Sequence, residues 1–301
     1  MAESSSGSSG KSSYVVDAPL QPPTATQGLL EVFRRRYLLK LLVRREINAR
    51  YSGSFLGLIW SYINPLSQLF IYIVVFGMLL DRGRTEQFPV HVFCGLIVVH
   101  FFTETFNAGT RSIVRNKALI RKMALPKEMF PVASMMVSLF HVGPQLVILL
   151  VTVLIVGWAP SGTGMLAFLL ALGIVMVLGT ALALMFSVAN VYFRDFASLV
   201  NIMTNFVRFG VPMIYPYSLV DERFGGLAEY YLWNPLSNAV LLVQRAFWVG
   251  TTENPERTAA EELPSHLFER GLVMLALSVV VLVVAQVVFR RLENRIPERL
   301  T

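Results

Sequence analysis

Long apolar segments alternate with short polar ones along most of the chain. Six of these segments reach roughly 20 residues, the length that an α-helix needs to cross the hydrocarbon of a bilayer. They lie near residues 54–80, 88–108, 130–157, 164–190, 198–218 and 271–290. The sequence therefore predicts an all-α integral membrane protein with six transmembrane helices.

A helix of a different kind is predicted before the first span, at residues 29–42. Four apolar side chains recur there at steps of three and four: Leu30, Phe33, Tyr37 and Leu41. They share one helix face, and the basic side chains between them have long stems that can snorkel toward water. We expect an N-terminal amphipathic helix at the membrane interface. A helix packed against another protein surface is the alternative.

The polar connection between the last two predicted spans contains a second apolar segment. Residues 236–249 are too short to cross a bilayer, and Asn234-Pro235 separates them from residues 226–233. Aromatic side chains, which favour the membrane interface, cluster here: Tyr230, Tyr231, Trp233, Phe247 and Trp248. We expect two short re-entrant helices that dip into the outer leaflet and pack beside protein or a water-filled conduit.

The composition agrees with a membrane protein. Hydrophobic residues make up 54% of the 301 residues and charged residues 15%, whereas soluble domains average about 25% charged residues. Such a chain has too few charges to cover a globular surface. The one cysteine, Cys94, lies in an apolar segment, where we expect a small buried side chain. A disulfide within the chain is therefore impossible.

Lysine and arginine are unevenly distributed between the connections. Residues 34–50 hold seven of them, residues 109–129 hold six, and the tail after 289 holds four. With six spans these segments lie on one side of the membrane, together with Arg194, and the other side has few basic residues. Excess positive charge marks the cytoplasmic side. Both termini are therefore expected in the cytoplasm, and the net charge of +7 indicates topology rather than a nucleic-acid partner.

The segments outside the spans complete the predicted organisation. Residues 1–27 are rich in Ser, Gly and Pro and are expected to form a disordered cytoplasmic tail. An interface helix and charged coupling segment follow at 28–50, a transmembrane domain at 51–292 and a cytoplasmic tail at 293–301. The GSSGKS at 7–12 is not a phosphate loop, because the motif's first glycine is missing and no strand precedes it.

Motifs for enzyme chemistry are scarce. His100 and Glu104 stand four apart on one helix face, which is a possible metal pair, but His91 and Cys94 point to other faces. No metal site is expected. The acidic residues between the last two spans are interpreted as solvated loop charge: Asp221, Glu222, Glu229, Glu253, Glu256, Glu261 and Glu262.

The fifth predicted span carries a polar stripe. Its members recur at i, i+3, i+4 and i+7: Asn201, Thr204, Asn205 and Arg208. An arginine inside a span usually faces the bundle interior or water, and Pro212 and Pro216 prevent a regular helix beyond it. This pattern favours the wall of a pathway. The alternative is a stripe that packs on another helix, with Arg208 snorkelling to the interface.

Other local patterns concern the first and fourth spans. Glu46 lies four residues before Arg50, a spacing that can pair on a helix. Asn64-Pro65 is expected to break the first span and free backbone groups, which suits a conduit wall. Small residues at steps of four let helices approach closely. They are Gly53 and Gly57 near the first span and Gly179, Ala183 and Ser187 in the fourth.

Four segments together resemble the permease subunit of the ABC-2 family, in particular the subgroup that exports polysaccharides such as O-antigen, teichoic acid and capsule-type glycans. The first is carried by Arg45, Glu46, Arg50, Tyr51, Ser54, Gly57, Trp60, Pro65 and Leu66. The others are NKALIRKMALP at 116–126, NVYFRDF at 190–196, and the P-x-x-Y-P at 212–216 with NPL at 234–236. The resemblance covers roughly residues 29–292.

This resemblance implies a homodimer in the bacterial cytoplasmic membrane, in contact with membrane lipids, with two ABC ATPase subunits docked on its cytoplasmic face. ATP and Mg would bind those partners, and this chain would hold no cofactor. The implied coupling residues are Arg45, Glu46, Arg50, Asn116, Lys117, Arg121, Lys122, Pro126 and Lys127. The conduit residues are Trp60, Tyr62, Asn201, Asn205, Arg208, Tyr215 and Tyr217, and the outer gate is Tyr230, Tyr231, Trp233, Asn234 and Pro235.

The function that these expectations favour is export of a lipid-linked polysaccharide, with a cell-wall galactan as one possible cargo. Aromatic residues such as Trp60 and Tyr215 could stack on sugar rings or anchor the helices at the interface. Alternatives are a drug or antibiotic exporter of the same family, a membrane enzyme that modifies lipid-linked sugar, and a scaffold without a transport role.

Overall fold

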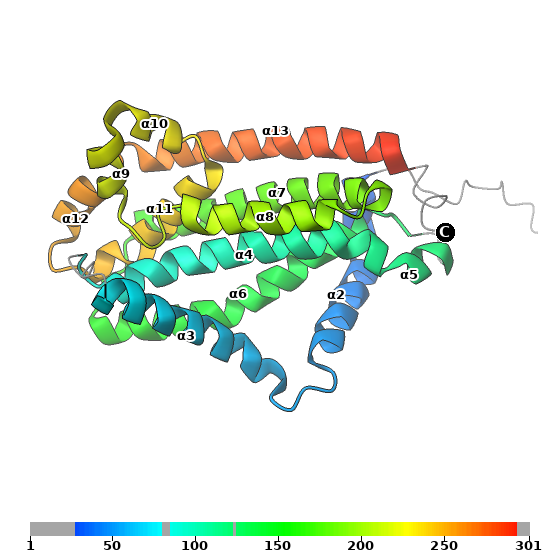
Figure 1. The fold of residues 1–301 in the computed structure, drawn as a ribbon, viewed down its shortest axis with the longest axis horizontal. Coiled ribbons are helices and arrows are strands. Elements are labelled where there is room, and N and C mark those ends of the chain that lie inside the picture. Colours follow the sequence, from blue (N-terminus) through cyan, green and yellow to red (C-terminus); the bar gives the residue numbers. More distant parts are fainter. Residues whose placement is uncertain (1–27, 80–84, 123–124, 294–301) are drawn as a thin grey trace, which may run out of the picture.

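The computed structural model describes residues 28–79, 85–122 and 125–293. Within these ranges the chain is helical and has no strands, as an all-α membrane protein requires. Four long helices form the bundle: α4 (Phe88–Arg115), α6 (Met129–Val156), α7 (Gly162–Tyr192) and α13 (Leu267–Glu293) (Figure 1). The predicted tails, including GSSGKS, lie outside the described residues, apart from Glu293 at the end of α13.

The α4 helix is the centre of the bundle and packs on α6, α7 and α11 (Pro235–Phe247). Its contact with α7 is close because small residues meet there. A Cβ placed on Gly109 would lie 2.4 Å from the Cβ of Ala183, and one on Gly179 would lie 3.0 Å from the Thr105 Cγ2. The predicted close approach at Gly179 and Ala183 is therefore confirmed, with α4 as the neighbour.

Five helical segments among the described residues are long and apolar enough to cross a membrane. They match the predicted spans except the fifth. In its place lies α8 (Phe196–Gly210), whose 15 residues are about 22 Å long, shorter than the roughly 30 Å of bilayer hydrocarbon. Residues 211–216 then continue without helix, because Pro212 and Pro216 interrupt the backbone hydrogen bonds. The prediction of six full-length spans is thus not confirmed.

The first span runs over Gly57–Met78 and is built from η1 (Gly57–Ile59), α3 (Trp60–Tyr72) and the π-helical η2 (Ile73–Leu79). The predicted break at Asn64-Pro65 is wrong, because α3 continues through Pro65. Membrane helices tolerate proline where side chains satisfy the nearby backbone. The Ser67 hydroxyl donates to the Asn64 carbonyl at 2.8 Å, next to the proline, whereas the carbonyl that loses its donor to Pro65 is that of Ser61.

The predicted interface helix consists of α1 (Leu29–Arg34) and α2 (Arg36–Tyr51). All four residues of its predicted apolar stripe are exposed: Leu30, Phe33, Tyr37 and Leu41. The opposite face is also apolar, and Val32, Leu39 and Leu42 are buried in a cluster with α6 and α13 residues. The helix pair therefore has one face on the bundle and a second apolar face directed outward.

The connection between α8 and α13 folds into short helices. They are α9 (Tyr217–Phe224), η3 (Gly225–Leu227), α10 (Ala228–Tyr231), α11, η4 (Val249–Thr251) and α12 (Pro255–Glu262). The re-entrant arrangement expected for 236–249 takes a different form. The α11 helix is buried between α4, α7 and α13, and Trp248 donates its indole N–H to the Glu86 carbonyl at 2.7 Å. The apolar side chains of α11 are therefore covered by protein rather than by lipid.

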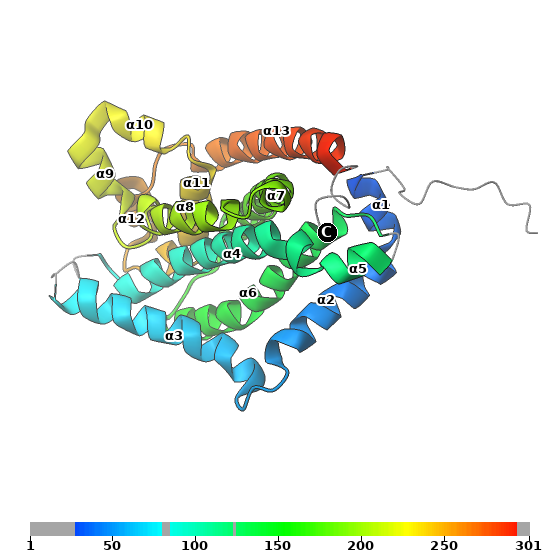
Figure 2. The ribbon, with the colours of Figure 1, turned by 45° about the vertical axis from the view of Figure 1, so that its right-hand side comes forward.

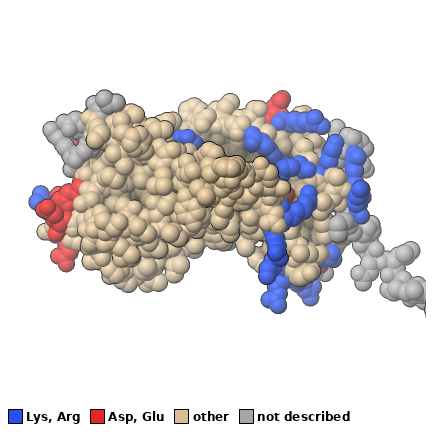
Figure 3. All heavy atoms as spheres, turned by 90° about the horizontal axis from the view of Figure 1, so that it is seen from below, with Lys and Arg blue, Asp and Glu red and all other residues tan. Residues whose placement is uncertain are grey.

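The two ends of the molecule carry different charges. The α1, α2 and α5 (Lys117–Lys122) helices and the C-terminal end of α13 gather at one end (Figures 1 and 2). Figure 3 shows lysine and arginine side chains concentrated there and acidic side chains at the other end. We call these the basic end and the opposite end. The opposite end holds α9, α10 and α12 (Figure 1).

Candidate functional site

The predicted coupling residues lie at or near the basic end, but only some of them are accessible. Arg45, Arg50, Lys117, Arg121 and Lys122 are exposed. Asn116 is buried at the corner between α4 and α5, where its side-chain amide donates to Glu46 and to the Ser112 carbonyl. Exposed positions can meet a partner directly, whereas Asn116 holds the corner in shape.

Pro126 and Lys127 are also buried, just before α6 begins. The Lys127 ammonium donates to the Glu293 carbonyl at 2.9 Å and lies 3.7 Å from its carboxylate. Burial lowers the pKa of Lys127 below its usual value, because the interior disfavours the charged form. Beside it, Gln286 donates to Glu128 at 3.0 Å. This group joins the start of α6 to the end of α13 and does not face outward.

The pairing of Glu46 with Arg50 that their spacing allows does not form. Each residue finds its partner on another helix, because α2 packs on α6 and the side chains of Glu46 and Arg50 reach α4. Glu46 accepts from Arg115 at 2.6 Å and from Asn116 at 3.2 Å. Arg50 instead pairs with Glu104 of α4. The two charges of α2 therefore bridge helices rather than stabilise one.

Sequence reasoning missed His141, which contacts Glu104 through its Nδ1 at 2.7 Å. His100, one turn away, lies 2.7 Å from the Gln145 side-chain amide nitrogen. The spacing of His100 and Glu104 indicated that these two side chains share a helix face. No local pattern in the sequence indicates that His141 and Gln145 of α6 are their partners. No group of three or more potential metal ligands occurs in the described ranges.

The predicted conduit residues up to Arg208 lie on α3 and α8, which both pack on α4, whereas Tyr215 follows α8 and Tyr217 begins α9. Trp60 and Asn205 are exposed, and Tyr62 and Arg208 are partly exposed. The polar stripe of α8 also touches α4. Arg111 donates to Asn201 at 3.1 Å, and the Asn107 amide donates to Thr204 at 3.2 Å. One side of the stripe therefore packs on α4, while Asn205 on the other side is exposed.

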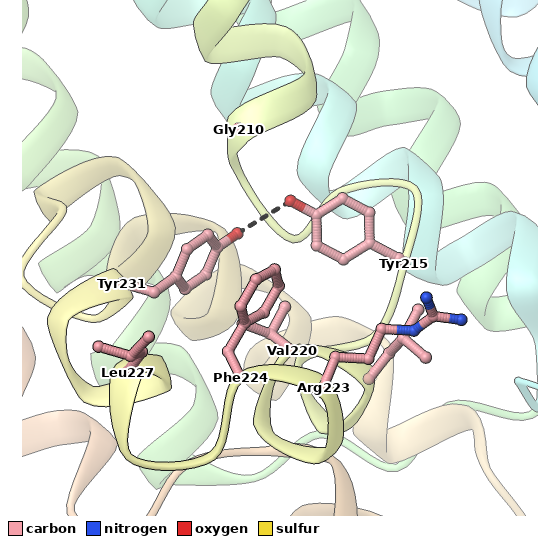
Figure 4. A pocket seen from close by; sticks show the side chains of 8 residues that line it. Gly210, Tyr215, Val220, Arg223, Phe224, Leu227 and Tyr231 are labelled. Atoms are coloured by element: carbon pink, nitrogen blue, oxygen red, sulfur yellow. Dashed lines mark hydrogen bonds between the residues drawn. The ribbon is translucent and has the colours of Figure 1, made fainter.

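A pocket at the opposite end brings a predicted conduit residue together with a predicted gate residue. The hydroxyls of Tyr215 and Tyr231 lie 3.3 Å apart and face each other across it (Figure 4). The Tyr215 hydroxyl also lies 3.1 Å from the Phe209 carbonyl and donates to it. Burial and the contact with Tyr215 raise the pKa of Tyr231 above its usual range, so the Tyr231 phenol stays neutral at physiological pH.

This tyrosine pocket has a volume of about 570 Å³ and is mostly apolar. It is lined by Gly210, Tyr215, Leu219, Val220, Arg223, Phe224, Leu227 and Tyr231. It lies between the end of α8 and the α9–α10 segment (Figure 4). The aromatic rings, the two hydroxyls and the Arg223 guanidinium could bind a sugar or an amphiphile.

The other predicted gate residues have separate roles. Tyr230 and Trp233 are exposed. The Asn234 side chain accepts from the Leu236 N–H at 3.0 Å and caps α11, and Pro235 is its first residue. Tyr217 lines a second, polar hollow with Asp221, Glu229 and Arg270. Only Tyr231 of the predicted gate reaches the tyrosine pocket.

Comparison with known families gives one match that spans most of this architecture. The family described as ABC-2 type transporter matches residues 37–248, from α2 to the residue after α11. This range is more than two thirds of the chain and includes every predicted coupling, conduit and gate residue. The chain belongs to the ABC-2 type transporter family. This ABC-2 chain is accordingly a multi-pass membrane protein and a transport subunit, not an enzyme.

Characterised relatives align with similar coverage. The ABC-2 chain is 28% identical over 218 residues to the O-antigen export system permease protein RfbA of Myxococcus xanthus. This alignment covers 72% of this chain and 83% of that protein. It is 26% identical over 215 residues to a protein of the same name from Klebsiella pneumoniae, with 71% and 81% covered. It is 24% identical over 218 residues to the polysialic acid transport protein KpsM of Escherichia coli, with 72% and 83% covered.

Proposed function

We propose that this chain is the transmembrane subunit of an ATP-binding cassette exporter that moves a lipid-linked polysaccharide across the bacterial cytoplasmic membrane. The observation that carries the proposal is the alignment with permeases named for O-antigen export and polysialic acid transport. Both cargoes are polysaccharides, and the alignments cover more than four fifths of each of those proteins.

Six crossings of the membrane follow if α8 counts as a short one. Val32 of α1 and Phe289 of α13 belong to one buried cluster, so both ends of the described chain lie at the basic end. A chain that starts and finishes on one side crosses an even number of times. Five full-length spans therefore need α8 with residues 211–216 as the sixth. The basic end then faces the cytoplasm, as the excess of positive charge supports.

A homodimer would supply the conduit. The faces of α3 and α8 that carry Trp60, Tyr62 and Asn205 point away from the chain's own bundle. Exposed apolar side chains such as Phe70 and Phe206 accompany them. A second copy would enclose these faces, and the polar residues of α8 would then line a path between the two chains. The tyrosine pocket would lie at the outer end of that path, where Tyr215 and Tyr231 could contact sugar rings.

Energy would come from two ATPase subunits, which would bind ATP and Mg and dock at the basic end. The α5 helix suits that contact, because Lys117, Arg121 and Lys122 are exposed on it. Lys127 is unsuited to direct contact because it is buried against Glu293. We therefore assign docking to α5 and the exposed part of α2.

Export of a drug or antibiotic is the second candidate, and one observation favours it. The tyrosine pocket is mostly apolar, and its 570 Å³ falls within the range of small-molecule sites. A passage for small amphiphiles would use such a pocket as a binding site, whereas a polysaccharide path would use it as a gate.

Depletion of the protein in its native cell separates the candidates. If a polysaccharide is the cargo, a polymer linked to a polyprenyl lipid accumulates on the cytoplasmic side while its synthesis continues. Protease-protected inverted vesicles and lipid extraction would show where that polymer lies. Normal surface polymer together with a new drug sensitivity would support the second candidate and refute the first.

Docking through α5 is tested by Lys122→Glu, with Lys122→Arg as the matched control. Reversal of an exposed charge should weaken binding of the ATPase while the permease still accumulates in the membrane, because exposed charges contribute little to stability. Co-purification of the ATPase and the export rate would both fall for Lys122→Glu only. Equal co-purification of both variants would count against α5 as the docking helix.

A further inference from the structure

Ionisable side chains meet deep inside the bundle, at a place that the tyrosine pocket and the docking helix do not include. Glu104 precedes the end of α4 by 11 residues, or about 16 Å along the helix. Its neighbour His141 lies near the middle of α6 and is buried. Charged groups at such depth are costly and usually serve a function.

Hydrogen-bond chemistry fixes the roles in this cluster. The Glu104 carboxylate can only accept, so the His141 Nδ1 at 2.7 Å must carry a proton and donate to it. The Arg50 guanidinium donates to the same carboxylate oxygen. Arg50 also lies 3.1 Å from the His141 Nδ1, but two donors cannot bond to each other. Glu104 is therefore the shared acceptor that holds α2 and α6 on α4.

The same end of α2 is fastened at a second point. Glu46, one turn before Arg50, accepts from Arg115 at 2.6 Å and from Asn116 at 3.2 Å. Asn116 stands between α4 and the docking helix α5. The last turns of α2 therefore contact both the middle of α4 and the corner at which α5 begins.

Tyr51 extends these contacts to the first span. Its ring packs edge-on against His141, with centroids 6.0 Å apart, and its hydroxyl lies 2.5 Å from the Ser61 hydroxyl. Between them, a Cβ placed on Gly53 or Gly57 would have no neighbour within 4 Å, so these two positions do not pack on the bundle. The side chains of Arg50 and Tyr51 thus connect the start of the first span to α4 and α6.

We propose that Glu104 and His141 are positioning residues that, with Arg50, transmit movement of the docking end into the first span. This proposal deepens the proposed exporter function and rests on it. When an ATPase shifts α5, the contacts of Glu46 carry the shift to α2. The Arg50–Glu104–His141 cluster then makes the start of α3 move with α4 and α6. Without the Glu104 charge, α2 loses this link to α4 and α6, and ATP hydrolysis proceeds without an equal movement of the conduit wall.

Apolar side chains in place of the whole Arg50–Glu104–His141 cluster would serve packing at least as well, since replacing complete buried ion pairs by well-packed apolar groups is often neutral or stabilising. A purely structural role therefore does not require this carboxylate. A role in transmission does, because the carboxylate makes a directional contact that links three helices. The two views differ in what they predict for coupling.

The first test uses Glu104→Gln, which keeps the shape of the side chain and removes its charge. Export per ATP hydrolysed by the complex with its ATPase should fall roughly two- to thirtyfold, the range found for residues that carry coupling. Permease abundance and basal ATPase activity should persist. The matched control is Glu261→Gln, which removes a carboxylate from an exposed ion pair with Arg257. Wild-type coupling in Glu104→Gln would overturn the proposal.

The second test measures how closely the end of α2 is held to α6, and it needs neither cargo nor ATPase. Ala49 of α2 and Ser138 of α6 line one hollow of about 360 Å³ beside Arg50 and Glu104. Cysteines at these two positions, in a chain with Cys94→Ser, can be joined by a short thiol cross-linker. Glu104→Gln should lower the cross-linking yield several-fold. An unchanged yield would refute the claim that Glu104 holds α2 close to α6.

Restoring the lost contact with the cross-link separates a role of Glu104 in transmission from a role in folding. In isolated cross-linked protein, the covalent link replaces the lost contact, so Glu104→Gln should recover export per ATP. Failure to recover would overturn the transmission role. If Glu104→Gln does not accumulate, Arg50→Gln tests the same contact from the exposed side, and normal coupling there would also refute the proposal. Absence of any export by the wild-type complex would instead count against the proposed function, while the cross-linking result still stands.

Discussion

Two spans of this ABC-2 chain, Gly57–Met78 and Phe88–Arg115, are almost equally apolar but have opposite surroundings. In the most apolar part of the first span only 6% of residues are buried within the chain, against 83% for α4. The reason is that lipid tails and protein interiors are both apolar, so the same composition suits either. Hydropathy therefore identifies a span but not its neighbours.

The polar residues of the two spans follow the same division. Glu104 and Thr110 of α4 are bonded inside the bundle, one to other helices and one to its own backbone. Trp60 and Asn64 of the first span are exposed. Trp60 and Asn64 are thus accessible from outside the chain's own bundle, whereas Glu104 and Thr110 help to hold the bundle together.

Phenylalanine truncation should show the largest contrast between the spans. Phe106 of α4 is buried, and its ring meets that of Phe186 edge-on with centroids 5.0 Å apart. Phe106→Ala should lower the free energy of unfolding by about 3 kcal/mol, because the cavity cannot refill. Phe70→Ala in α3, where the ring is exposed, should cost less than about 1 kcal/mol. Unfolding of purified protein in detergent measures both.

The same two variants, Phe70→Ala and Phe106→Ala, can also show that the contrast between the spans does not hold in the assembled exporter. If Phe70→Ala costs as much as Phe106→Ala in the assembled exporter but not in dissociated chains, a second copy covers α3. The exposure of the first span would then describe the separate chain only.

Adding a methyl group should give an intermediate contrast. Gly109→Ala in α4 places a Cβ 2.4 Å from that of Ala183, so α4 and α7 must separate at a cost of about 1–3 kcal/mol. Gly77→Ala in the first span places a Cβ 3.4 Å from the Phe88 ring and 4.0 Å from the Ile73 Cγ2, which are ordinary contacts. That change should be neutral or slightly stabilising, since alanine favours helix. Equal melting temperatures of the two variants would contradict the close α4–α7 contact.

Removing one methyl group should show the smallest difference. Ile113→Val in α4, at a fully buried position, should cost about 0.5–1.5 kcal/mol. Ile71→Val in α3, at an exposed position, should change the free energy of unfolding by less than about 0.5 kcal/mol. Chemical unfolding of the two variants side by side checks the ranking, and a larger effect at Ile71 would reverse it.

The candidate sites were predictable to different degrees. Local periodicity was sufficient for the outward stripe of α1 and α2 and for the polar stripe of α8, because both depend on steps of three and four along one helix. It was insufficient for the partners of Glu46 and Arg50. An i,i+4 spacing allows a pair, but packing offered each charge a partner on another helix. The tyrosine pocket joins residues 16 positions apart, which no helix period connects.

The sequence by itself determined what depends on composition and local spacing. That includes the all-α membrane class, the positions of five spans, the concentration of basic residues in particular connections and the resemblance to ABC-2 permeases. Each follows from the cost of placing polar groups in lipid, which acts on every segment separately. Only the tertiary structure decided which spans surround α4, that α11 is buried and that Lys127 bonds to Glu293. These depend on helix packing between distant segments, where lipid and protein are equally apolar and shape and hydrogen bonding select the partner.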